Sequence, residues 1–374
     1  MTSDVFFVDM RAGFKLNMPA KLELLLDAMN MPSDLRTRDL VCIKLHFGEK
    51  GNTAYIPPVY VRKVVDKVKS LAGKPFLCDA NTLYVGTRSD SVSHLTTALE
   101  NGFAYAVVGA PVIIADGLKG ASFVEVHLDR EYTKTAYVAA DIMEADYLIS
   151  LAHFKCHELT GFGGALKNIG MGGGARRGKL DQHSNLSPKV DKKKCIGCED
   201  CVNHCAQHAF VMDKNKSHID PEKCVGCGEC ILVCLQGAIQ IQWSQEVHVM
   251  QKKMVDYAEA ILKHKKGKTV FINFLTSISP ACDCYGHADA PIVTDVGILA
   301  SRDPIALDQA SADLVNRQAG RAETMLKTNL NPGDDKFRGV YPNIDWEIQL
   351  AYGQEIGLGV RSYRLIKLPV EAEG

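Results

Sequence analysis

The sequence of 374 residues lacks several features that would assign it to particular classes of protein. No apolar run approaches the roughly 18 residues of a membrane-spanning helix. Neither charge dominates, with 43 Lys and Arg against 44 Asp and Glu, so no overall basic field exists to attract nucleic acid. Residues 1–20 lack the basic start and the long apolar run of a signal peptide. We therefore expect a soluble, cytoplasmic protein that spans no membrane and binds no nucleic acid.

Cysteine, by contrast, is abundant. There are 13 cysteines, and in a reducing compartment clustered thiols bind metal more often than they pair as disulfides. Eight of them form two runs of the same spacing, C-x2-C-x2-C-x3-C. These runs are Cys195, Cys198, Cys201 and Cys205, followed by Cys224, Cys227, Cys230 and Cys234. The second run repeats the first at an offset of 29 residues, which indicates an internal repeat.

This spacing is typical of [4Fe-4S] ligation, in which the fourth cysteine of each run binds the other cluster. The sequence therefore predicts two [4Fe-4S] clusters. We expect cluster 1 on Cys195, Cys198, Cys201 and Cys234, and cluster 2 on Cys205, Cys224, Cys227 and Cys230. The region resembles a bacterial-type dicluster ferredoxin, although Ala206 and Leu235 replace the proline that usually follows each fourth cysteine. A zinc site is the alternative, but it usually has two separated C-x2-C pairs.

Outside this region, short apolar runs alternate with helical patterns, which predicts an α/β fold with a mostly parallel sheet covered by helices on both faces. Strands are expected at 4–9, 39–45, 75–80, 112–116, 123–128, 147–153, 269–275 and 292–299. Helices are expected at 58–72, 89–101, 249–264 and 303–318. Because the pattern resumes after the cysteines, we predict a small α+β ferredoxin-like domain at 189–243, inserted between two parts of the α/β domain at 1–188 and 244–374.

A basic stretch precedes the first cysteine run. From 175 to 194 the acidic residues are Asp181 and Asp191, and the basic ones are Arg176, Arg177, Lys179, Lys189, Lys192, Lys193 and Lys194. Such a strip is suited to steering an acidic redox partner protein. The other interpretation is a solvated, flexible connector.

Polar side chains cluster just after several predicted strands, where open α/β sheets bind ligands. We predict one pocket there for a small anionic molecule. The candidate catalytic residues are Lys155, His157 and Cys284. The other pocket candidates are Lys44, His46, Glu49, Lys167, Asn168, Cys282 and Asp283. The glycine-rich stretch 161–174 fits neither a Walker motif nor a dinucleotide fingerprint, which leaves an anion cradle or a flexible loop.

Cys282 and Cys284 are too close in sequence for an unstrained disulfide. In a loop with Asp283, they are suited to binding an additional metal, a flavin or a substrate, or one of them to acting as a nucleophile. Two of the other thiols, Cys42 and Cys78, lie inside predicted strands and are expected to be buried apolar residues.

Five segments together resemble the domain-of-unknown-function family 362, over most of residues 40–315. They are Lys44 to Glu49, Lys155 to His157, Gly164 to Asn168, Cys282 to Cys284 and Asp295 to Pro304. Many members carry a dicluster ferredoxin module and are described only as iron-sulfur-binding proteins, so the resemblance implies the architecture rather than a reaction.

We expect an iron-sulfur protein that moves electrons between its two clusters and a site on the α/β domain, as an oxidoreductase acting on a small anionic substrate or a bound cofactor. One alternative is an electron carrier or docking adaptor without catalysis. Another is a maturation factor that transfers metal through Cys282 and Cys284.

Overall fold

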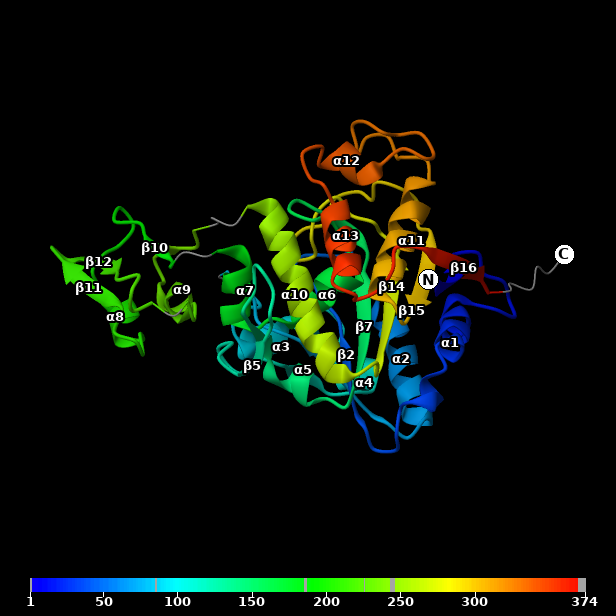
Figure 1. Cartoon of the computed structure of the whole chain (residues 1–374), viewed down its shortest axis with the longest axis horizontal. Helices are drawn as coiled ribbons and strands as arrows, with labels where there is room; N and C mark the ends of the chain where they lie inside the picture. Colours follow the sequence, from blue (N-terminus) through cyan, green and yellow to red (C-terminus); the bar gives the residue numbers. More distant parts are fainter. Residues whose placement is uncertain (1, 85, 185–186, 225, 243–245, 369–374) are drawn as a thin grey trace.

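The fold is organised around one large sheet (Figure 1). The computed structural model describes residues 2–84, 86–184, 187–224, 226–242 and 246–368. Within them the large sheet has eight strands, in the order β16 (Tyr363–Lys367), β1 (Ser3–Asp9), β15 (Gly297–Ser301), β14 (Thr269–Leu275), β7 (Tyr147–His153), β2 (Leu40–Lys44), β3 (Lys74–Asp79) and β4 (Val112–Ile114). β15 runs antiparallel to its neighbours β1 and β14, and the other strand pairs of this sheet are parallel. The predicted α/β fold with a mostly parallel sheet is confirmed.

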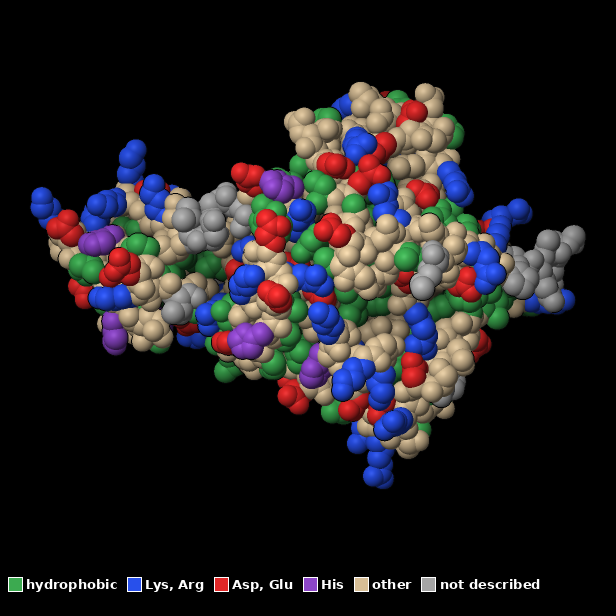
Figure 2. All heavy atoms as spheres, in the orientation of Figure 1, with side chains coloured by type: hydrophobic (Ala, Val, Ile, Leu, Met, Phe, Trp, Pro, Cys, Tyr) green, Lys and Arg blue, Asp and Glu red, His purple; other side chains and the backbone are tan. Residues whose placement is uncertain are grey.

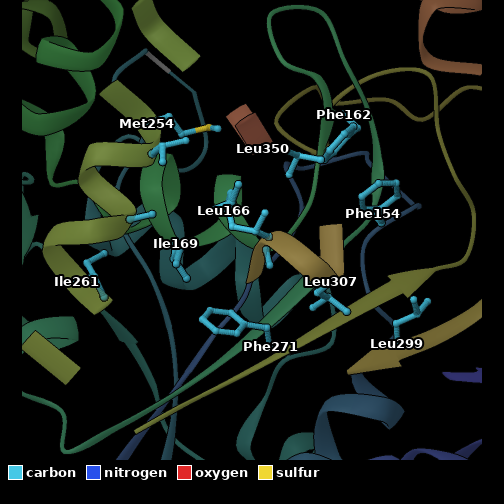
Figure 3. Packing of buried hydrophobic residues seen from close by; sticks show 14 of the residues in the cluster. Phe154, Phe162, Leu166, Ile169, Met254, Ile261, Phe271, Leu299, Leu307 and Leu350 are labelled. Carbon is cyan, nitrogen blue, oxygen red and sulfur yellow. The ribbon is translucent and has the colours of Figure 1, made fainter. Parts of the chain in front are cut away.

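Apolar layers lie on both faces of this sheet because its central strands are apolar on both sides. One layer packs β2, β7 and β14 against α1 (Met18–Ala28) and α2 (Pro58–Ser70). The other packs the opposite side chains of the same strands against α6 (Ala165–Gly173), α10 (Val247–Lys265), α11 (Pro304–Asn316) and α13 (Glu347–Glu355). Figure 3 shows part of the second layer, where Phe271 of β14 lies beneath Leu166 and Ile169 of α6.

The remaining elements are short or peripheral. The other helices are η1 (Met31–Ser33), α3 (Ser91–Glu100), α4 (Tyr105–Val108), α5 (Ala140–Glu144), α7 (Arg176–His183), α8 (Asp200–Asn203), α9 (Glu229–Val233) and α12 (Lys336–Val340). The paired strands outside the large sheet are β5 (Phe123–His127) with β6 (Thr135–Ala139), β8 (Lys155–His157) with β9 (Gly161–Gly163), β10 (Lys189–Val190) with β13 (Ile239–Gln240), and β11 (Phe210–Asp213) with β12 (Lys216–Ile219).

Two strand predictions need correction. The run at 123–128 forms β5, which pairs in a hairpin with β6 and takes no part in the large sheet. The run at 292–299 is displaced, since the strand is Gly297–Ser301. The apolar residues at the start of the predicted run, Ile292 and Val293, are buried in the core without belonging to a strand of the large sheet.

The glycine-rich stretch 161–174 forms strand β9 (Gly161–Gly163) and helix α6 (Ala165–Gly173), rather than a flexible loop or an anion cradle. A Cβ on Gly170 would lie 2.1 Å from the backbone oxygen of Met254, and one on Gly173 would meet Ile261. The glycines therefore let α6 approach α10 closely. The amides of Ala165 and Leu166 at its start donate to the Asp308 carboxylate, at 2.7 and 3.0 Å, so the protein's own acid occupies this helix N-terminus.

The elements from β10 to β13, Lys189 to Gln240, lie beside α7, outside the layers of the large sheet (Figure 1). We call them the cysteine module and the remainder of the chain the α/β body. The module has its own small apolar cluster, which includes Val190, Phe210 and Ile239. Leu83 and Leu180 of the body belong to the same cluster, so the two regions share an apolar contact.

The predicted basic strip is not continuous on the surface. Arg176 and Lys179 belong to α7 and are buried, because Arg176 donates to the carbonyl oxygens of Lys119 and Ser89. Lys192, Lys193 and Lys194 are exposed. Figure 2 shows basic side chains gathered at the outer end of the module. Among the described residues, no helix combines the length and apolar character needed to cross a membrane.

Candidate functional site

A cavity of about 620 Å³ lies at the carboxyl ends of β2, β3 and β7, where an open parallel sheet is expected to bind ligands. α6, α7 and α10 and the loop around Cys282 complete its walls. Of the residues predicted from the sequence, eight line it: Lys44, His46, Lys155, His157, Lys167, Asn168, Cys282 and Cys284. Segments more than 200 residues apart in sequence thus meet in one site.

Two predicted pocket residues, Glu49 and Asp283, stand behind the cavity wall instead of lining it. Glu49 accepts from Arg88 Nε at 3.1 Å. Asp283 lies 2.9 Å from both His153 Nδ1 and Lys155 Nζ. Both carboxylates are buried and orient cationic residues that do line the cavity.

Asp283 is the anchor of the Cys282 loop. Burial opposes ionisation of its carboxyl, but the charges of His153 and Lys155 outweigh this and hold the pKa of Asp283 well below its usual value. His153 also presents Nε2 to the Thr276 carbonyl at 2.8 Å, so both ring nitrogens face oxygen acceptors, as suits an imidazolium. The backbone of Asp283 is held as well, since its carbonyl accepts from the amide of Glu49 at 3.0 Å.

Cys282 is arranged as a thiolate. A hydrogen bond from the Cys284 thiol, the Lys167 ammonium and His157 together overcome burial and hold the pKa of Cys282 well below that of a free cysteine. Lys167 Nζ lies 3.8 Å from Cys282 Sγ, and the amide of Cys284 lies 3.4 Å from it. The same interaction raises the pKa of Cys284 well above its usual value.

Lys44 belongs to an ion-pair network at the end of β3. Its two partners, Asp79 and Arg88, were not among the predicted site residues. Lys44 Nζ lies 2.9 Å from Asp79 Oδ1, and Arg88 Nη1 lies 3.6 Å from Asp79 Oδ2. Burial opposes ionisation, but these cations hold the pKa of Asp79 below its usual value. The position of Asp79 at the carboxyl end of the predicted strand 75–80 was the available signal. Nothing in the local sequence marks Arg88, which reaches the site from the loop before α3.

Three other histidines near the cavity, His46, His94 and His183, are neutral. Burial lowers the pKa of His46 well below its usual value, and Nδ1 of this ring accepts from the Gly48 amide at 2.9 Å. Burial also lowers the pKa of His94 and of His183 to about 3. His157 Nδ1 accepts from the Leu159 amide at 3.2 Å, which leaves its Nε2 as the N–H, 3.8 Å from Glu158, another cavity-lining residue.

One side of the cavity is apolar. It is formed by Met171 of α6, Met250 and Met254 of α10, and Leu83 and Leu159. The methionines could not be assigned from sequence, because at helical spacing they fit an ordinary core equally well. The site can therefore hold an amphipathic molecule, with an anionic part at the lysines and an apolar part against the thioethers.

The eight clustered cysteines line two small cavities in the module. One, of about 20 Å³, is lined by Cys195, Cys198, Cys201 and Cys234. The other, of about 100 Å³, is lined by Cys205, Cys224, Cys227 and Cys230. Within the described residues, no three His, Cys, Asp or Glu side chains are gathered closely enough to hold a single metal ion.

Comparisons with known proteins give distant structural similarities. The lactate racemase apoprotein from Thermoanaerobacterium thermosaccharolyticum is similar with 13% identity and a TM-score of 0.34, over 61% of this chain and 48% of that one. A protein of Thermotoga maritima is similar with 9% identity and a TM-score of 0.38, over 92% of this chain and 60% of that one. The chain thus spans less than two thirds of either protein. No curated protein matches.

A family model described as domain of unknown function DUF362 matches residues 41–313. This match includes the strands that end at the cavity, α6, the cysteine module and the Cys282 loop. Because the match covers well over half of the chain, the protein belongs to the DUF362 family.

Proposed function

We propose that the protein is an iron-sulfur oxidoreductase, in which two [4Fe-4S] clusters exchange electrons with a small anionic substrate or cofactor bound in the large cavity. The observation that carries the proposal is the grouping of the cysteines. Each small cavity is lined by the first three cysteines of one run and the fourth of the other, the exchange that two-cluster ferredoxins use.

The donor chemistry fits such clusters, which require thiolates that accept hydrogen bonds from backbone amides. The amide of Ala209 lies 3.3 Å from Cys205 Sγ, and the amide of Ala238 lies 3.2 Å from Cys234 Sγ. These two alanines occupy equivalent positions in the sequence repeat. When bound, the clusters would accept and release single electrons.

The cluster 2 cysteines are on the side of the module that meets the body. Gly228, between Cys227 and Cys230, packs closely enough that a Cβ there would lie 3.0 Å from Arg176 and 3.4 Å from Leu83. Leu83 also lines the large cavity. A single side chain therefore separates this part of the module from the cavity, which supports the cavity as the site served by the clusters.

Residues of the body would bind and orient the anion. Lys167 is the best placed cation, because its Nζ faces the Cys282 sulfur at 3.8 Å, whereas Lys44 and Lys155 are held by carboxylates. His157 presents an N–H at the cavity and is suited to giving a proton to a reduced product. A cavity lined by a cation and a proton donor favours an enzyme over an adaptor that only carries electrons.

The first test is iron and acid-labile sulfide per chain on protein purified without oxygen. Two clusters predict about eight of each. Cys234→Ser and Cys205→Ser should each lower the count, whereas Cys156→Ser, which alters a buried thiol outside both sets, should not. Wild-type protein that binds no iron after anaerobic reconstitution would refute the proposal.

We also propose an acidic electron-donor protein as the redox partner, in the cytoplasm. Lys192, Lys193 and Lys194 are exposed immediately before Cys195. Changing the three to Glu should slow reduction by an acidic donor at low salt, and the difference from wild type should shrink as salt screens the charges. The Lys63→Glu variant, on α2 and distant in sequence, serves as the control. Equal rates for both variants at low salt would contradict this partner.

A further inference from the structure

Cys282 and Cys284 form a thiol pair that the ligand sets of the cysteine module leave unused. Their loop is fixed from the side opposite the cavity, because the Asp283 carboxylate between them is held by His153 and Lys155. Both cysteines line the cavity. The loop therefore presents two sulfurs to any bound molecule while its middle residue is fixed in the wall.

The two sulfurs are not equivalent. Cys282 has a cation at 3.8 Å, Lys167 Nζ, and a backbone N–H at 3.4 Å, both of which stabilise a thiolate. Cys284 is hydrogen-bonded as the protonated partner, and the opposite pKa shifts of the pair agree with this assignment. In thiol–disulfide exchange the thiolate attacks and a neighbouring thiol completes the reaction.

We propose that Cys282 and Cys284 are a redox-active pair that cleaves the sulfur–sulfur bond of a small anionic disulfide bound in the cavity. The Cys282 thiolate attacks one sulfur, forms a mixed disulfide and releases the first half of the ligand as a thiolate. Cys284 then attacks Cys282 Sγ, gives its proton to the second half and releases it as a thiol. A Cys282–Cys284 disulfide remains.

Two electrons and one proton restore the thiolate and thiol. The electron source is a low-potential one-electron donor acting through the cysteine module, and in this respect alone the inference rests on the proposed function. A disulfide closed over one intervening residue is strained. Strained disulfides are more oxidising than structural ones, so re-reduction is favourable. Lys167 in the wall selects an anionic ligand.

The probe is 5,5'-dithiobis(2-nitrobenzoate), an anionic aromatic disulfide whose released thiolate is coloured. It is added to protein reconstituted with iron and sulfide, so that the eight clustered cysteines are occupied. Wild type should release two more equivalents of thiolate than the Cys282→Ser/Cys284→Ser variant, because each sulfur displaces one half of the probe. Cys156→Ala, which removes a core thiol, should behave as wild type.

The single variants separate the two roles. The Cys284→Ser variant should release one equivalent of thiolate. The other half of the probe should remain as a mixed disulfide on the peptide that contains Cys282. Cys282→Ser should react at least about tenfold more slowly, because Cys284 has little thiolate. Equal release from wild type and the double variant, or equal rates for the two single variants, would overturn the proposal.

Re-reduction distinguishes this inference from the proposed function. In Cys227→Ser, which lacks a cluster 2 ligand, the release that depends on Cys282 and Cys284, measured against Cys227→Ser with both of them also changed to Ser, should be unchanged in the first turnover. The comparison cancels the reaction of the other cluster 2 cysteines, which lie free in both proteins. Re-reduction of the pair by a one-electron donor should stop. Continued re-reduction would refute the electron route and leave the thiol pair standing. If Cys227→Ser loses the thiolate release that depends on Cys282 and Cys284 but keeps the iron of cluster 1, the claim that the thiol pair reacts without cluster 2 would be refuted.

Discussion

The α/β body and the cysteine module are stabilised in different ways. The body buries long apolar helices against both faces of its sheet, and this packing outweighs the desolvation cost of buried ion pairs such as Lys44–Asp79. In the described residues, the module contributes seven buried side chains to its apolar cluster, two of them cysteines. A region this small rarely folds on apolar burial alone. From this comparison we expect the module to depend on the proposed iron-sulfur clusters for its stability, whereas the body depends on packing.

The largest expected effect follows from this difference. Removing iron with a chelator, or changing Cys230 to Ser, should abolish most amide exchange protection of β11 and β12, because bound metal supplies most of the folding free energy of small metal-binding domains. Protection of β14 should be unchanged. Hydrogen exchange measured by mass spectrometry tests this expectation. If β11 and β12 stay protected from exchange without iron, the proposed difference in stabilisation between module and body is wrong.

A smaller effect is expected inside the body. Asp79→Asn leaves Lys44 and Arg88 buried without their shared carboxylate, and breaking a buried ion pair costs about 3–5 kcal/mol. Denaturant unfolding of the body should show this loss. Asp129→Asn is the matched control, since that carboxylate pairs with Lys134 in solvent and should change stability by less than about 1 kcal/mol. Equal effects would mean that the cavity network does not stabilise the body.

The pH dependence of the body sharpens the comparison further. Burial lowers the pKa of His94 to about 3, so below about pH 6.5 the unfolded chain binds a proton that the folded chain does not. Stability should therefore fall as the pH decreases from 6.5 toward 3, with a contribution of up to about 1.4 kcal/mol per pH unit from this residue. His94→Gln should remove that slope, and His127→Gln, at an exposed position, should not. An unchanged slope in His94→Gln would contradict the neutral assignment.

The smallest effect concerns the contact between the regions. Lys119 of the body lies 2.8 Å from Glu229 of the module, and the lysine is largely exposed. Exposed ion pairs contribute about 0.2–1 kcal/mol, so Glu229→Gln should scarcely change the exchange protection of α9. A double-mutant cycle with Lys119→Met measures the coupling. A value above about 2 kcal/mol would show that this pair, rather than Leu83 and Leu180, couples the module to the body.

Local signals were sufficient for several features. The apolar runs of β2, β7 and β14 and the Asp303-Pro304 start of α11 were predicted closely, because burial on both faces and helix capping are local in origin. Most of the pocket candidates were found in the same way, as polar residues directly after strands. The predicted cluster ligands remain a prediction that the iron count will test.

Other features were misjudged because their cause is not local. The glycines of α6 were expected to form an anion cradle or a flexible loop, although they serve close packing against α10. Arg176 was taken for part of a surface strip, although it is buried by carbonyl acceptors from another segment. Glu49 and Asp283 were expected in the pocket but orient cations from behind it. In each case a partner distant in sequence decides the environment.

The sequence by itself thus determined the element types of the body, the repeated cysteine spacing and the carboxyl-end location of the polar residues, since each depends on neighbours along the chain. Only the tertiary structure decided which charges are paired, which sulfur is the thiolate and which part of the module faces the cavity. Those properties depend on burial and on distances between residues far apart in sequence, because electrostatic interactions are set by spatial separation and solvent exclusion.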